Sequence, residues 1–351
     1  MAGRRIQVML IVLVLAVTLS AFGLLWPTGS DWFYVFYPTA RSWLAGETHL
    51  YDAGASQGFY LMPWGILVLA PLAAIGLRWG QAVLAMLTLC SLVLAVFATD
   101  AKVKPWIVLL AVANLHTFDA LIRGNVDALP LLGLALGWLG LQKRKPFVLG
   151  VGLWLLAIKP INVALPVLVL LYGMRRWTKR EIIKALLPMS ATFILSFAVC
   201  GLDWPVRYTA MMKANPPLIY LQTSLWRALV AVGLPRWCAH LVAVPACGLA
   251  LWQLWRHGVT LPILALAITT NLLFTPYALG SHYVLLAIPF VILASCYKVT
   301  VLTWLLTFTP LLRLRFGFDI ACLDVCYPLA LWLSVVLLGA GLVRQDGLSR
   351  Q

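Results

Sequence analysis

The sequence between Ile6 and Trp26 reads IQVMLIVLVLAVTLSAFGLLW and contains no charged residue. An apolar helix of about 20 residues is long enough to cross the hydrocarbon core of a bilayer. The segment is longer than the h-region of a typical signal peptide, although Arg4 and Arg5 give it a similar basic start. We therefore expect an uncleaved first span whose start is held inside the cell by the two arginines.

The composition of the whole chain extends this interpretation. Of its 351 residues, 63% are hydrophobic and 11% are charged, against about 25% charged residues in soluble domains. A soluble globule is therefore excluded. Further apolar runs are found at residues 61–77, 79–98, 105–122, 126–141, 146–174, 185–201, 236–255, 259–275, 283–297, 299–312 and 319–343. They predict an all-α polytopic membrane protein, a single integral-membrane domain over residues 1–351 with roughly 11–13 transmembrane or re-entrant helices.

The formal net charge of +15 would suggest a nucleic-acid partner in a soluble protein. Here the dense cationic runs, such as Lys143 to Lys145 and Arg175 to Lys184, adjoin long apolar segments. Cations in this position are typical cytoplasmic anchors, so we expect contacts with membrane lipids and no nucleic acid. The seven cysteines stand singly and show no metal-ligand spacing, and we expect no metal and no cofactor.

Two polar stretches, residues 28–60 and 202–228, are predicted to be loops on the external face, together with the turn from Thr275 to His282. Counting spans from the N-terminus, however, places Lys143 to Lys145 outside, against the positive-inside rule. Two interpretations resolve the conflict. Either one segment between residues 61 and 141 is re-entrant, or residues 146–174 form one long tilted helix kinked at Pro160 and the basic turn is external. The first agrees with the charge.

Asp31 follows the first span directly and precedes an aromatic-rich segment. A helix after Asp31 would place an apolar stripe on one face, which predicts a helix lying on the membrane surface, with a kink or early break at Pro38. The stripe consists of Trp32, Val35, Phe36, Ala40, Trp43 and Leu44. Asp31 could cap this helix, or it could act as a general base toward a hydroxyl; the two roles are compatible.

Other polar residues interrupt apolar sequence. Arg123, Asn125 and Asp127 do so in LIRGNVDALPLL, and Lys159 and Asn162 do so in LLAIKPINVALP. Ionisable groups at membrane depth usually face a cavity or a partner, but a lysine can also extend its amine to the headgroups. Because Pro160 predicts a break in the helix, we favour a polar cavity at Lys159.

External cations could receive an anionic substrate group or lie in solvent. Those of the second loop are Arg207, Lys213 and Arg227. His282 lies on the same predicted face as Asp31. The chain lacks GxGxxG, GxxxxGK[ST], HExxH, GxSxG and DxD motifs, which argues against ATP-driven transport and against nucleotide-sugar chemistry.

Several short elements occur in a recognisable order. They are Asp31 followed by aromatic Phe33 to Tyr37, LAGETHLYD (residues 44–52), YLMPWGILVLAPLA (60–73), RGNVDALPLLGLALGWLGLQKRKP (123–146), AIKP (157–160) and TPYALGSHYVLLAIPF (275–290). In this order and spacing the chain resembles the integral-membrane GT-C glycosyltransferases of glycosyltransferase family 87, which includes polyprenyl-phosphate-mannose-dependent mannosyltransferases. It departs from the family pattern at Met62, where a proline is common, and at Gly124 and Asn125, which replace a Gly-Gln pair.

The resemblance implies a GT-C-like bundle in the plasma (cytoplasmic) membrane with its active site facing outward. It also implies a lipid-phosphate sugar donor such as polyprenyl-phosphate mannose, a lipid or glycan acceptor, inversion at the anomeric carbon, and Asp31 as general base. The departing phosphate must be held by cations, for which Lys159 and His282 are the first candidates. The further substrate-binding candidates are Asn125, Tyr283, Arg207 and Arg227.

Two other hypotheses follow from the same charges. A transporter or flippase of a lipid-linked glycan would line its pathway with them, but it should show related halves, and the sequence contains no such repeat. A non-catalytic membrane scaffold would not require Asp31, Lys159 and His282 on one side.

Overall fold

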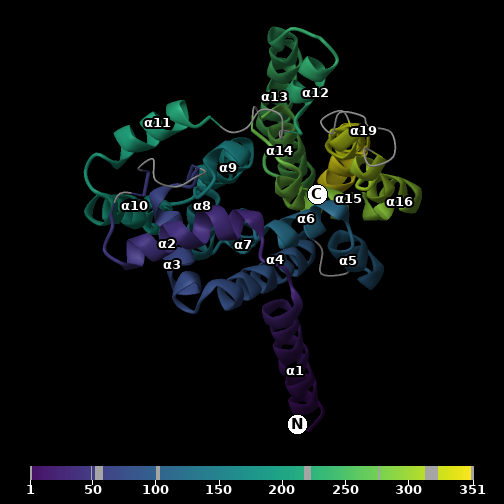
Figure 1. Ribbon diagram of the computed structural model, residues 1–351. Coiled ribbons are helices and arrows are strands. Elements are labelled where there is room, and N and C mark those ends of the chain that lie inside the picture. The colour runs from purple at the N-terminus through teal and green to yellow at the C-terminus, as the bar shows by residue number, and fades with distance from the viewer. Residues whose placement is uncertain are drawn as a thin grey trace.

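The computed structural model describes residues 2–48, 50–51, 58–99, 103–216, 223–275, 277–312 and 323–348. Every regular element in these ranges is a helix, which confirms the all-α prediction (Figure 1). The N-terminal half contains α1 (Ala2–Leu25), a π-helical turn (Trp32–Phe36), α2 (Tyr37–Leu44), α3 (Ile66–Ala74), α4 (Leu77–Thr99), α5 (Pro105–Val112), α6 (Leu115–Arg123), α7 (Ala128–Gln142) and α8 (Pro146–Leu156). It is followed by α9 (Ala164–Gly173), α10 (Lys179–Cys200), α11 (Trp204–Ala214), α12 (Leu225–Ala231), α13 (Arg236–His257), α14 (Leu261–Phe274), α15 (Ala287–Ile292), α16 (Tyr297–Leu306) and α19 (Cys326–Leu348).

The chain is a polytopic membrane protein. Within the described ranges, three helical segments are long and apolar enough to cross a bilayer: Leu77–Thr99, Lys179–Cys200 and Trp237–His257. α5 and α6 pass the same test together but are bent by 52° at the break between them, the geometry of a broken span or a re-entrant loop. Within the described residues, most of the other predicted runs correspond to shorter apolar helices of 10–17 residues.

Residues 146–174 are not one kinked helix. α8 ends at Leu156 and α9 begins at Ala164, with a 3-10 turn from Pro160 to Asn162 between them. Proline lacks the N–H that a continuing helix needs. Asn271 of α14 compensates for the break, because its Nδ2 donates to the Ile161 carbonyl at 2.9 Å and its Oδ1 accepts from the Leu165 N–H at 3.0 Å. Lys159 therefore lies in irregular backbone supported by a neighbouring helix.

The segment after Asp31 is helical, as predicted, and part of its apolar face packs against protein. Trp32, Val35, Phe36 and Ala40 are buried in a core that includes Leu69 of α3. Pro38 lies in the first turn of α2, where the π-helical turn ends. These four residues of the predicted stripe thus pack against protein, whereas Leu44 is 43% exposed; the position of this helix at the membrane surface stays a prediction.

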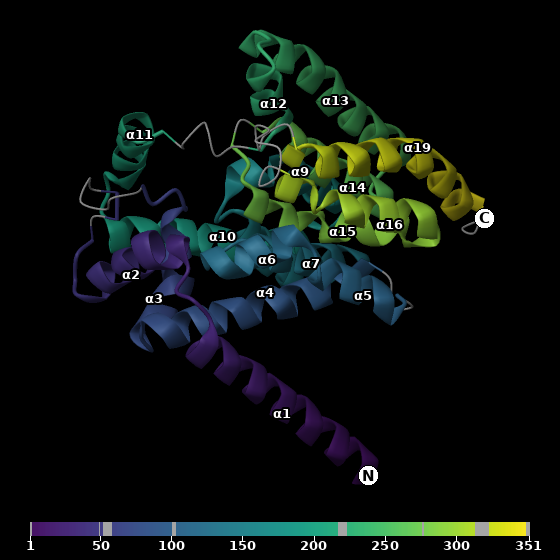
Figure 2. The same cartoon turned by 45° about the vertical axis from the view of Figure 1, so that its right-hand side comes forward.

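Small residues allow the central helices to approach closely. α7 packs against α4 on one side and α8 on the other. A Cβ placed on Gly133 would lie 2.8 Å from the Gly152 carbonyl oxygen of α8, so only glycine permits this spacing, as in small-xxx-small contacts between membrane helices. α1 extends away from the other helices in both views (Figures 1 and 2). The candidate site is formed by side chains from the turn between α6 and α7, from the α8–α9 break, from Asp31 and from the 3-10 helix Gly280–Leu286.

Candidate functional site

Hydrogen bonds to α4 fix the segment that carries Asp31. The Gly29 N–H donates to Gln81 Oε1 of α4 at 2.9 Å, and the Trp32 indole N–H donates to the Leu77 carbonyl at 2.8 Å. The Asp31 carboxylate makes no cap hydrogen bond to the helix that follows it. N-capping therefore does not fix the position of the Asp31 side chain.

A left-handed turn brings Asn125 to Asp31. α6 ends at Gly124, whose φ is +64°, and a Cβ there would lie 2.7 Å from Trp32 Cβ. A side chain at position 124 would thus be strained and would collide with the Asp31 segment. Past this turn, Asn125 is buried and its Nδ2 donates to Asp31 Oδ2 at 2.8 Å.

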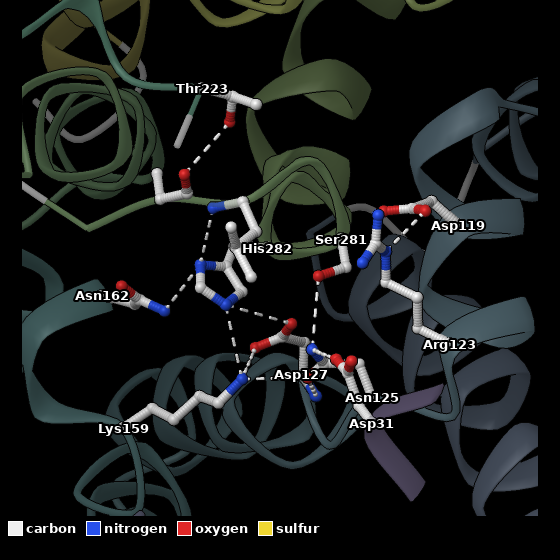
Figure 3. A network of polar contacts seen from close by, with 12 residues as sticks. Asp31, Asp119, Arg123, Asn125, Asp127, Lys159, Asn162, Thr223, Ser281 and His282 are labelled. Carbon is white, nitrogen blue, oxygen red and sulfur yellow. Dashed lines mark hydrogen bonds and ion pairs between the residues drawn. The ribbon is translucent and has the colours of Figure 1, made fainter. Parts of the chain in front are cut away.

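Lys159 forms the centre of a buried network (Figure 3). Its Nζ donates to Asn125 Oδ1 at 2.9 Å and to Asp127 Oδ1 at 2.8 Å. The Lys159 side chain is 9% exposed and that of Asp127 is 0% exposed. An ammonium buried to this degree is normally paired, and Asp127 is the partner that neutralises it.

The contacts of His282 define its tautomer. Its Nδ1 lies 3.1 Å from the Leu279 backbone N–H and 3.0 Å from Asn162 Nδ2. A backbone N–H can only donate, so Nδ1 is an acceptor and the ring hydrogen is assigned to Nε2. Nε2 faces Asp127 Oδ2 at 3.7 Å and Lys159 Nζ at 3.4 Å. His282 in this arrangement is a neutral group that orders the turn and faces the ion pair.

The electrostatics of Asp31 differ from those of Asp127. Burial raises the pKa of Asp31, and the charges of Arg123 and Lys159 and the hydrogen bond from Asn125 oppose that shift. Arg123 is itself paired with Asp119 at 2.8 Å. Unlike the fully buried Asp127, Asp31 keeps part of its surface exposed. It is thus a partly accessible carboxylate with a raised proton affinity, which suits proton exchange with a bound hydroxyl.

A cleft whose empty space, open solvent included, is ≈ 340 Å³ adjoins the network. It is lined by Tyr60, Lys159, Pro160, Ile161, Asn162, Tyr208, Met212 and Tyr277. Lys159 and Asn162 therefore belong both to the buried network and to the wall of the cleft. Among the described residues, no group of three or more His, Cys, Asp or Glu side chains could hold a metal ion.

Three further predicted substrate-binding residues lie on elements around this network. The Tyr283 hydroxyl donates to the Thr223 carbonyl at 2.5 Å, and the ring is fully buried. Arg207 is paired with Asp203 at 2.7 Å within the α11 region, and Arg227 lies on α12. The roles of these three residues stay predictions.

Sequence reasoning did not include Asp127, Asn162 and Ser281 among the site residues. Asn125 Nδ2 lies 3.3 Å from Ser281 Oγ, and the other two contact Lys159 and His282. Charge balance could have identified Asp127, because a lysine expected at membrane depth requires an acid nearby. Asp127 is two residues from Asn125, in the same polar interruption.

The protein is an all-helical membrane protein, and a buried network of acid, amide and lysine side chains lies beside its cleft. These features are those expected of a membrane-embedded enzyme. The family model of glycosyltransferase family 87 matches residues 59–293, well over half of the chain. The chain therefore belongs to glycosyltransferase family 87 and is a glycosyltransferase. No curated protein and no solved structure matches it. The matched residues include Asn125, Lys159 and His282, whereas Asp31 precedes them.

Proposed function

We propose that this glycosyltransferase transfers a hexose such as mannose from a polyprenyl-phosphate donor to a hydroxyl of a lipid or glycan acceptor. The transfer would take place at the extracytoplasmic face of the plasma membrane and invert the anomeric carbon. The observation that supports it most is the hydrogen-bonded chain from Asp31 through Asn125 to Lys159, which joins a carboxylate to a cation beside a cleft.

Asp31 is the general base in this proposal. Its carboxylate accepts the proton of the acceptor hydroxyl while the hydroxyl oxygen bonds to C1 of the sugar. The bond from C1 to the phosphate oxygen breaks, and the lipid phosphate leaves with the bonding electrons. Asn125 holds one carboxylate oxygen of Asp31 through its N–H, so the carboxylate is fixed before the acceptor arrives.

Lys159 is proposed to contact the departing phosphate. Its Nζ donates two hydrogen bonds within the protein, to Asn125 Oδ1 and to Asp127 Oδ1. An ammonium has three N–H groups, and one remains for a phosphate oxygen on the side of the cleft. Developing charge on that oxygen strengthens this hydrogen bond in the transition state. His282, with a neutral ring, is proposed to position Lys159 and Asp127 rather than to carry charge.

The test is Asp31→Asn in the reconstituted protein, with polyprenyl-phosphate mannose as donor and membrane extract as the source of acceptor. Asparagine keeps the size of the side chain but cannot accept the proton. Loss of a general base lowers the rate by roughly 10²–10⁴-fold, while donor binding should change far less. Asp203→Asn, which changes an exposed acid outside the network, is the matched control and should stay close to wild type.

Near-normal transfer by Asp31→Asn would remove Asp31 from the role of base. The transporter hypothesis predicts a different result: the wild-type protein transfers no sugar from any lipid-linked donor but moves a lipid-linked glycan between leaflets. Both assays can be run on the same proteoliposomes.

A further inference from the structure

Only one of the two polar atoms of the Asn162 amide has a hydrogen-bond partner in the described part of the chain. Its Nδ2 faces His282 Nδ1 at 3.0 Å, whereas its Oδ1 is buried and has no hydrogen-bond partner among the described residues. Figure 3 shows the amide nitrogen pointing toward the His282 ring and the oxygen pointing away from it. Because the Leu279 N–H fixes His282 Nδ1 as an acceptor, rotating the amide would place two acceptors against each other. The orientation is therefore determined, and Oδ1 is left as an unused acceptor.

Asn271 shows what a fully used amide looks like in the same region. It is also buried, and it contacts the same irregular backbone after Lys159. Its Nδ2 donates to the Ile161 carbonyl and its Oδ1 accepts from the Leu165 N–H. A buried acceptor without a donor is unfavourable, so the Oδ1 of Asn162, a residue that is 2% exposed and lines the cleft, is available to a donor from a ligand.

The other residues around the cleft indicate the chemistry of that ligand. Three tyrosines line it, and each has a contact that holds its ring. The Tyr60 hydroxyl donates to the Asn215 carbonyl at 2.7 Å. The Tyr208 ring packs edge-on against Tyr51 with centroids 5.2 Å apart, and the Tyr277 ring packs edge-on against His282 at 5.3 Å. Among the described lining residues the one charged group is Lys159, which Asp127 already neutralises. A neutral ligand with an apolar face and hydroxyl groups on its edge matches such a surface.

We propose that this cleft is a pyranose-binding subsite in which Asn162 Oδ1 accepts a hydrogen bond from one sugar hydroxyl. The inference rests on the proposed function and deepens it by assigning sugar selectivity to one residue. Asn162 then has two roles: its Nδ2 hydrogen-bonds to His282, and its Oδ1 recognises a hydroxyl of the sugar. Lys159 borders the same cleft, which places the sugar next to the group proposed to contact its phosphate.

The experiment uses farnesyl-phosphoryl mannose and its four monodeoxy analogues, lacking the hydroxyl at C2, C3, C4 or C6. Their Kd values are measured by competition against the radiolabelled parent on the purified full-length protein. One analogue should bind wild type about tenfold more weakly, the effect of deleting one hydrogen bond to a buried acceptor. Asn162→Ala should weaken the parent by a similar factor and bind that analogue as well as the parent.

Two further variants separate hydroxyl recognition from folding. Asn114→Ala removes a partly buried amide that does not line the cleft, and it should keep the tenfold discrimination between the parent and the deoxy analogue. If Asn162→Ala does not fold, Asn162→Leu fills a similar volume with an apolar group and should likewise lose the discrimination.

Several outcomes would overturn the subsite. Wild type could bind all four analogues equally, or the tenfold ratio could persist in Asn162→Ala and Asn162→Leu. Affinity that follows the length of the isoprenoid chain and ignores the sugar would mean that the cleft holds lipid. Failure of the proposed function is distinct, because wild type would then neither bind farnesyl-phosphoryl mannose nor transfer its sugar.

Discussion

Replacing Asp127 with asparagine should strongly destabilise the protein by leaving a buried charge without its partner. The Lys159 Nζ to Asp127 Oδ1 distance is 2.8 Å, and the two side chains are 9% and 0% exposed. Removing one member of a buried ion pair costs about 3–5 kcal/mol. Asparagine keeps one acceptor oxygen toward Lys159. We therefore expect the free energy of unfolding to fall by about 3 kcal/mol, the lower end of this range.

Removing both charges should be much less harmful. In Asp127→Leu combined with Lys159→Met, no charge remains to be solvated, and replacement of a buried pair by apolar groups is often close to neutral. Asn125 then loses its lysine partner, which we expect to limit the recovery to a net loss of about 1–2 kcal/mol. The double-mutant cycle is built from Asp127→Leu, Lys159→Met and their combination. If each single change costs about 3 kcal/mol, the cycle should show a coupling of about 4 kcal/mol.

The measurement is equilibrium unfolding in mixed micelles, with SDS as denaturant and tryptophan fluorescence as the signal. Asp203→Asn serves as reference, because it breaks an exposed pair with Arg207 and should cost about 1 kcal/mol or less. If Asp127→Asn is no less stable than Asp203→Asn, the buried pair contributes nothing and the assignment of Asp127 as the partner of Lys159 is wrong.

Two further predictions concern the proton and the membrane. Burial raises the pKa of Asp31. As the pH is lowered, Asp31 should therefore become protonated, and the transfer rate should fall, at a pH above the usual carboxyl pKa of about 4. Asn125→Leu removes a hydrogen bond that opposes this rise and should move the acid limb of the pH–rate profile further up; an unmoved limb would contradict the Asn125–Asp31 contact. In a cysteine-free background, Glu47→Cys and Lys213→Cys should react with an impermeant thiol reagent in sealed cells, and Arg176→Cys should not. All three positions are exposed, unlike His282, and the opposite labelling pattern would reverse the orientation.

The sequence predicted the positions of the helices better than their continuity. The apolar run 79–98 corresponds closely to α4, Leu77–Thr99. The run 146–174 is interrupted around Pro160, as the proline predicts, but the apolar composition on both sides does not show what stabilises the break. What stabilises that break is Asn271, more than 100 residues away, and an interaction of this kind leaves no trace in local sequence.

The same limit applies to the site. Asp31, Asn125, Lys159 and His282 were predicted from chemistry, topology and resemblance, and they meet in one network. Asp127 and Asn162 interrupt apolar sequence, but their importance depends on contacts that span 32 and 120 residues of chain. Tyr283 was grouped with its neighbour His282. In a 3-10 turn adjacent side chains leave the backbone about 120° apart, so the tyrosine contacts Thr223 instead.

The network separates into a fixed part and a reactive part, and this division favours an enzyme over a transporter. Lys159 and Asp127 are paired and buried, with Asn125 and His282 against them, so a pathway lined by these charges would have to open and hydrate the pair in each cycle. That step is expensive for a buried ion pair. In the proposed mechanism, glycosyl transfer needs no such opening, because Asp31 is partly exposed and its carboxylate would only have to accept and release a proton. The buried pair can remain closed throughout the reaction, holding Asn125 against Asp31 while the acceptor and donor meet in front of it.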